Sequence, residues 1–134
     1  MAVLTVTTGR IAPNYPQKAQ IFSFVATSAI TAGQAVKFDT TGKVSPLSAA
    51  TAGKCAGIAL STVGAGQAVS VLKSGHCAGI DPAANNAGAS VYVGDTAGTV
   101  TDAAGTATIL AGSVVGIATA GAIEKVVYVD CVWN

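Results

Sequence analysis

The chain has 134 residues and a formal net charge of +1, with 10% charged and 51% hydrophobic residues. This length predicts one domain with a single core. The low charge, against a usual value of about 25%, indicates that much of the surface faces neighbouring molecules. The seven scattered basic residues are no nucleic-acid footprint.

The first twenty residues differ in pattern from the rest of the chain. They contain two prolines, which favour extended backbone, and two cations without a carboxylate. The sequence predicts an extended arm over residues 1–20, able to reach roughly 66 Å, followed by one domain over 21–134. A disordered tail is the alternative. The residues expected to bind a partner are Arg10, Ile11, Pro13, Tyr15, Pro16 and Lys18.

Short runs rich in Val, Ile, Phe and Thr follow, separated by Gly, Asp, Asn and Pro. This pattern is typical of an all-β domain of antiparallel strands, and no segment has the periodicity of a long helix. The expected strands are Val3–Thr7, Gln20–Ala26, Ala35–Asp39, Cys55–Leu60, Ala68–Lys73, Ser90–Val93, Val115–Thr119 and Lys125–Val132.

A repeated pentapeptide punctuates these runs. AGQAV begins at Ala32 and again at Ala65, and the similar AGASV begins at Ala87. Glycine permits a tight turn, and the x-Val-x pattern that follows is that of a strand. The pentapeptide is therefore interpreted as a turn that starts a strand. The later Asp-Thr-x-Gly motifs, at Asp39 and Asp95, are expected to be turns capped by aspartate.

The chain also contains one larger unit written twice. Residues 32–45 align with 87–101, and 52–71 align with 111–129 through Ala-Gly and Gly-Ile-Ala. The two copies, 32–71 and 87–129, predict two similar β-meander halves. We expect them to fold together into a small antiparallel β-barrel or sandwich.

The sequence gives little support to catalysis or to a metal site. His76 is the only histidine, and the carboxylates are too sparse for a calcium loop. Three cysteines without C-x-x-C spacing indicate free thiols and synthesis in a reducing cytoplasm. No signal peptide and no apolar run of about 18 residues occur, so no membrane partner is expected. We predict a protein that is not an enzyme and has no cofactor and no metal.

In its overall pattern the chain resembles the head decoration, or capsid cement, proteins of tailed bacteriophages. The resemblance covers the sequence from about Ile21 onward. It rests on AGQAV and AGASV, on Gly-x-Val at Gly42 and Gly98, on AGIAL and VGIAT, and on the final apolar run. It implies a β-barrel-like virion protein, made in the host cytoplasm, that binds the major capsid protein on the outer capsid surface as a homotrimer.

The alternative is a small β-domain that recognises a glycan or a cell surface. Such a domain usually exposes tryptophan or tyrosine on one face. The sequence predicts no such platform, because its aromatic residues are few and dispersed: Tyr15, Phe22, Phe24, Phe38, Tyr92, Tyr128 and Trp133.

Overall fold

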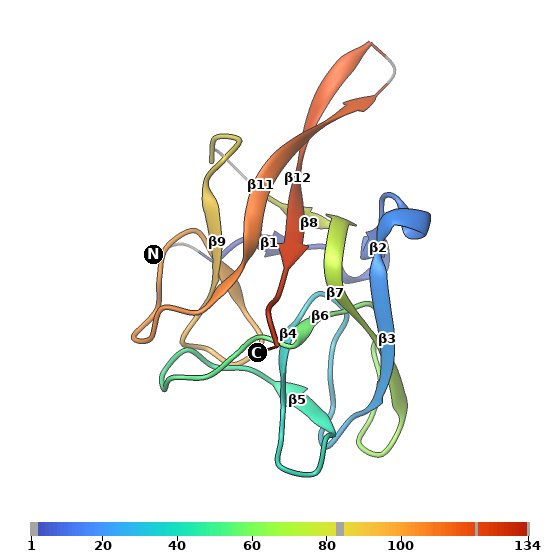
Figure 1. Cartoon of the computed structure of the whole chain (residues 1–134), viewed down its shortest axis with the longest axis vertical. Helices are drawn as coiled ribbons and strands as arrows, with labels where there is room; N and C mark the ends of the chain where they lie inside the picture. The colour runs from blue at the N-terminus through green and yellow to red at the C-terminus, as the bar shows by residue number, and fades with distance from the viewer. Residues whose placement is uncertain (1–2, 83–84, 120, 134) are drawn as a thin grey trace.

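The computed structural model describes residues 3–82, 85–119 and 121–133, which form β-strands and two 3-10 turns (Figure 1). Among them, no helix could span a membrane. The strands are β1 (Thr5–Val6), β2 (Ala12–Pro13), β3 (Gln20–Val25), β4 (Ala35–Phe38), β5 (Val44–Pro46), β6 (Gly57–Ala59), β7 (Ala68–Ala78), β8 (Ile80–Asp81), β9 (Ser90–Val93), β10 (Val100–Thr101), β11 (Leu110–Thr119) and β12 (Ala122–Asp130). The 3-10 turns are η1 (Thr8–Arg10) and η2 (Pro16–Lys18). The all-β prediction is confirmed.

The three pentapeptides share one backbone geometry. Their glycines, Gly33, Gly66 and Gly88, have φ angles of 91°, 83° and 93°. Strands β4, β7 and β9 each begin two residues later. Positive φ is strained for residues with a Cβ, so glycine is what allows the chain to turn there. The interpretation of the pentapeptide as a turn that starts a strand is confirmed.

The two Asp-Thr-x-Gly motifs use their aspartates differently. Asp39 accepts a hydrogen bond from the backbone N–H of Thr41 at 3.1 Å, as predicted for a capped turn. Hydrogen bonds from the hydroxyls of Thr27 and Thr41 lower the pKa of Asp39. Asp95 instead accepts the backbone N–H of Thr106, from a later loop, at 2.7 Å. The hydroxyl and the N–H of Thr106 lower the pKa of Asp95, so this motif ties two loops together.

The two halves have the same strand order and direction. The first half runs β5-β4-β6-β7, the second runs β10-β9-β11-β12, and all neighbours are antiparallel. The register also agrees, since Phe38 pairs with Val44 as Val93 pairs with Val100. Strands β7 and β12 pair with each other and join the halves into one sheet. The prediction of two similar antiparallel halves is confirmed, but neither half is a simple meander, because its first strand lies between its second and its third.

The register corrects the second sequence alignment. Gly57 faces Val36, and Gly112 faces Val91, so Gly57 corresponds to Gly112. The sequence alignment had matched Gly57 with Gly116, four residues away. Ala-Gly occurs at both 52–53 and 56–57, so the letters alone favour the wrong register. The structure selects the glycine that lies against the backbone of the neighbouring strand.

Strand β7 is the branch point of the sheet. On one edge it pairs with β3 and β2; on the other it pairs with β6 and then with β12. Leu72 of β7 is paired on both sides, with Ile21 of β3 on one edge and Ile58 of β6 on the other. The sheet curls into a half-barrel, and the β11–β12 hairpin projects from the body (Figure 1).

The first twenty residues are part of the folded unit, where the sequence predicted a separate arm. Strand β1 pairs with β8, and β2 pairs with the end of β7. Leu4 and Ile11 lie in the main core and are only 4% and 8% exposed. Prolines and missing periodicity predict an arm, but Ile11 fills the space beside Gly33 and Gly79, and Val6 also lies beside Gly33.

Candidate binding surface

Four aromatic side chains gather on one face of the first half and form the aromatic patch: Phe22, Phe24, Phe38 and Trp133. Phe22 and Phe24 project from the same side of β3, as alternate residues of a strand do. Phe38 ends β4, and Trp133 follows β12. The ring of Trp133 lies 5.1, 6.0 and 5.3 Å from those of Phe22, Phe24 and Phe38, measured between centroids.

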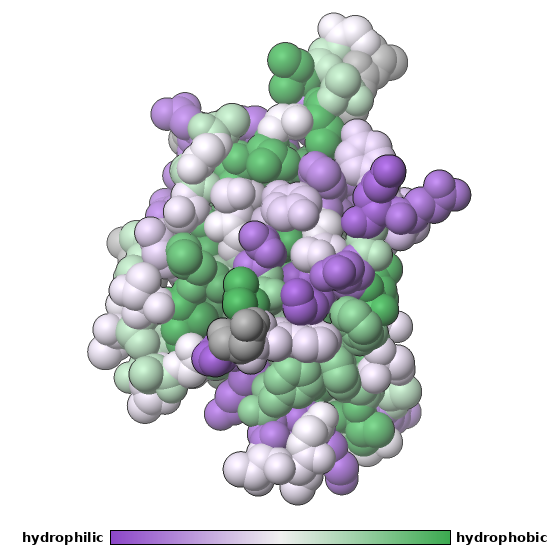
Figure 2. Space-filling view, in the orientation of Figure 1, coloured by the Kyte–Doolittle hydropathy of each residue, from purple (hydrophilic) through white to green (hydrophobic). Residues whose placement is uncertain are grey.

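The patch remains open to solvent. Phe22 is 42% exposed, Phe38 38% and Trp133 36%. Figure 2 shows apolar surface over the part of the molecule where β3, β4 and β5 lie. Large apolar side chains gathered at the surface mark interaction sites more often than single ones do. The prediction that the aromatic residues are too dispersed to form a platform is therefore wrong.

Internal contacts fix the position of Trp133 at the centre of the patch. Its indole N–H donates to the backbone O of Ala56 at 2.8 Å. The Lys73 ammonium lies 5.2 Å from the centroid of its ring, within the range of a cation–π contact. These two contacts fix the orientation of the indole ring. Its apolar face is presented to solvent, and its one hydrogen-bond donor is already used within the protein.

A pocket of about 370 Å³ adjoins the patch and is called the lysine pocket. Phe38 and Trp133 form its apolar wall, and Lys37 and Lys54 provide its charges. The backbone loop 52–56 completes it, and the N–H of Ala56 donates to Val36 O at 2.7 Å, which holds that loop against β4. None of the described residues that line this pocket carries a carboxylate, and their charges, those of Lys37 and Lys54, are both positive.

Strand β3 borders the patch and lies at an edge of the sheet. It pairs with β7, and no other described strand pairs with it. Its sequence, QIFSFV, contains no charge and no proline, the residues that usually protect an edge strand. Ile21 and Val25, on the face opposite Phe22, are 39% and 40% exposed. This edge strand adds further apolar surface available to a partner.

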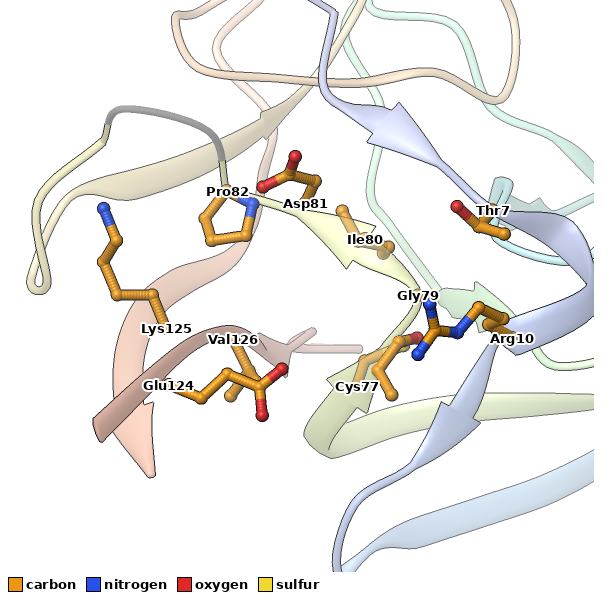
Figure 3. Close-up of a pocket in the computed structure, with 11 residues that line it drawn as sticks. Thr7, Arg10, Cys77, Gly79, Ile80, Asp81, Pro82, Glu124, Lys125 and Val126 are labelled. Carbon is orange, nitrogen blue, oxygen red and sulfur yellow. The ribbon is translucent and has the colours of Figure 1, made fainter. Parts of the chain in front are cut away.

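A second pocket, of about 320 Å³, lies between the N-terminal segment, the end of β7, β8 and residues 124–126 of β12 (Figure 3). Arg10 and Glu124 line it from different elements, and Lys125 donates to the backbone O of Asn85 at 2.8 Å. Cations and carboxylates both line this pocket, which gives it no single charge preference. The buried thiol of Cys77 also lines it.

His76 lies between two tyrosine rings. Tyr15 and Tyr128 contact it edge-on, each with a centroid distance of 5.0 Å. The three residues come from the N-terminal segment, β7 and β12, so the stack fastens the N-terminal segment to the sheet. Within the described residues, no group of His, Cys, Asp and Glu could hold a metal ion.

The six predicted partner-binding residues do not form one surface. Ile11 is buried in the core, which corrects its predicted role as an anchor on a partner. Tyr15 stacks on His76, although 41% of it is exposed. The other four are spread along the N-terminal segment: Arg10 in the second pocket, Pro13 in β2, and Pro16 and Lys18 in η2. Only the exposed members remain candidates for contact with a partner.

The three cysteines are buried, and we expect them to resist modification in the folded protein. Cys55, Cys77 and Cys131 are 3%, 0% and 1% exposed. Burial raises the pKa of the Cys77 thiol to about 12, which removes nearly all thiolate at neutral pH. Reaction with a thiol reagent should be slower than in urea by roughly 100-fold or more. Fast reaction of any thiol in the native protein would contradict this burial.

No protein-family model matches this sequence, and no curated protein shows significant similarity to it. The resemblance to capsid decoration proteins therefore stays a prediction. The geometry itself offers surfaces for binding: the aromatic patch, the lysine pocket and the β3 edge. Sequence reasoning missed Lys37, Lys54 and Trp133 as members of one surface. The spacing Phe22-x-Phe24 within a predicted strand was the one local signal of it.

Proposed function

We propose that the protein is a structural virion component that binds the outer surface of a tailed-phage capsid and cements neighbouring capsomers. Its partners in this proposal are the major capsid protein and other copies of itself in a homotrimer. It would be made in the host cytoplasm and act without a cofactor and without catalysis.

The observation that carries this proposal is the aromatic patch on a rigid, weakly charged β-scaffold. Clustered aromatic residues dominate the energetics of protein interfaces when a partner covers them. Among the described residues, ten large hydrophobic ones are at least 36% exposed, in a chain with only 10% charged residues. In a protein enclosed by neighbours, such an apolar surface is buried in interfaces. On a freely diffusing monomer, the same surface would promote aggregation.

Binding of the purified protein to heads that lack it tests the proposal. We expect particle imaging to show density for this chain at capsomer junctions. The double variant Phe22→Ser/Phe38→Ser should bind heads more than about tenfold more weakly, because hot-spot aromatics each contribute 1.4 kcal/mol or more. Leu110→Ser is the control, since Leu110 is 53% exposed and lies outside the patch. Heads that carry no such density would refute the proposal.

The second candidate, a glycan-binding module, is favoured by one observation, the gathering of four aromatic rings. Sugars stack on such rings, but their recognition also needs a few placed polar groups. Three of the four residues are phenylalanines, and the indole N–H of Trp133 is taken by Ala56. The aromatic patch therefore has no free hydrogen-bonding group on its four side chains, which favours a protein partner over a neutral glycan.

A further inference from the structure

The lysine pocket brings two cations together from separate segments. Lys37 comes from β4 and Lys54 from the loop before β6, and both side chains are exposed. The lining residues include no aspartate or glutamate. The nearest aspartate along the chain, Asp39, is occupied by the hydroxyls of Thr27 and Thr41. The charge complement of this pocket is an anion.

The other lining groups restrict what the anion can be attached to. Apart from the lysines and the thiol of Cys55, the side chains around the pocket are apolar: Phe38, Ala52, Ala56 and Trp133. The thiol contacts the backbone O of Gly57 at 3.5 Å. Among the described lining residues, no side chain carries an amide, a carboxylate or a hydroxyl that could bind the hydroxyls of a sugar. An anion carried on an apolar body fits these walls.

Apolar surface continues from the pocket across the sheet. Trp133 lines the pocket and also contacts Phe22 and Phe24 of β3. A ligand seated against Lys37 and Lys54 therefore has aromatic rings beside it on the β3 side. A peptide with a few acidic residues followed by a few apolar residues offers both kinds of group in one short segment, because its acidic end can lie at the lysines while its apolar end lies on the aromatic rings.

We propose that the lysine pocket and the aromatic patch together bind an acidic, apolar segment of a protein partner. The partner's carboxylates pair with Lys37 and Lys54, and its apolar side chains cover Phe22, Phe24 and Trp133. This inference rests on the proposed function in one respect, that the partner is a protein. It adds the chemistry of the segment that is recognised.

Trp133 makes the test direct, because it is the only tryptophan in the chain. The probe is an N-acetylated hexapeptide of three Glu followed by three Phe, titrated into the full-length protein while the tryptophan emission is recorded. We expect a saturable change in emission. The matching Gln–Phe peptide should bind at least tenfold more weakly, and binding of the Glu–Phe peptide should weaken as sodium chloride is raised.

The variant Lys37→Glu/Lys54→Glu should weaken binding of the Glu–Phe peptide at least tenfold. Lys43→Glu is the matched control, because Lys43 does not line the pocket; its effect should be less than threefold. Circular dichroism checks that each variant is folded. Equal binding of the Gln–Phe peptide, or no response to any peptide, would overturn the proposal. Tighter binding of trigalacturonic acid would instead assign the pocket to an anionic glycan.

Binding of the same variants to heads separates this inference from the proposed function. If heads bind the wild type and Lys37→Glu/Lys54→Glu equally well, the capsid role stands and the pocket is not its contact. If the Glu–Phe peptide binds as expected but heads acquire no protein, the pocket proposal stands and the capsid role fails.

Discussion

Alanine at Gly57 or at Gly112 is expected to destabilise the fold by about 3 kcal/mol or more. The two glycines hold equivalent positions in the two halves, each against the backbone of the following strand. A Cβ at either position would lie 2.9 Å from the carbonyl carbon of the facing residue, Leu72 or Tyr128, and closer still to its oxygen. Backbone inside a sheet cannot move away without breaking its pairing. Urea unfolding measures the loss.

Gly9→Ala is the control for this prediction. Gly9 lies in η1 with no atom within 4 Å of an added Cβ and without a positive φ. Its replacement should change the free energy of unfolding by less than about 0.5 kcal/mol. Near-neutral stability of Gly57→Ala and Gly112→Ala would show that β6 and β11 do not approach their neighbours so closely. The assigned correspondence of the halves would then lose its physical basis.

Local turn chemistry is the part of the fold that the sequence predicted best. The positive φ angles of Gly33, Gly66 and Gly88 follow from the pentapeptides, since few other residues tolerate that geometry. The exact register did not follow, because Ala-Gly recurs along the chain and the sequence does not show which glycine lies close to a neighbouring backbone. What marks Gly57 and Gly112 is the carbonyl group that faces each of them across the sheet, and this contact leaves no trace in the local sequence.

The candidate site was much less predictable than the turns. Phe22 and Trp133 are 111 positions apart, and their contact depends on how β12 pairs with β7. Lys37 and Lys54 likewise meet only because β4 lies beside the loop before β6. A site assembled from separate strands leaves no motif in the sequence. The predicted binding residues instead lie within residues 1–20, because this segment has an unusual composition. Composition does not show that Leu4 and Ile11 are buried.

Deleting residues 1–18 is expected to destabilise the protein by about 4 kcal/mol or more, contrary to the expectation for a separate arm. The deletion removes Leu4 and Ile11 from the core, and truncation of such a side chain to alanine costs about 2–5 kcal/mol. It also removes the pairing of β1 with β8 and of β2 with β7. Since domains of this size are stable by only about 5–15 kcal/mol, the truncated chain should be close to unfolding.

Single substitutions separate the role of the N-terminal segment in folding from any role in attachment. Ile11→Ala should cost about 2–4 kcal/mol in urea unfolding, whereas Lys18→Ala, at an exposed position, should cost less than about 0.5 kcal/mol. If the segment also contacts a capsid, Lys18→Ala and Arg10→Ala should weaken binding to heads without loss of stability. An Ile11→Ala protein as stable as wild type would show that the segment is an arm after all, and that its contacts with the sheet contribute little to the fold.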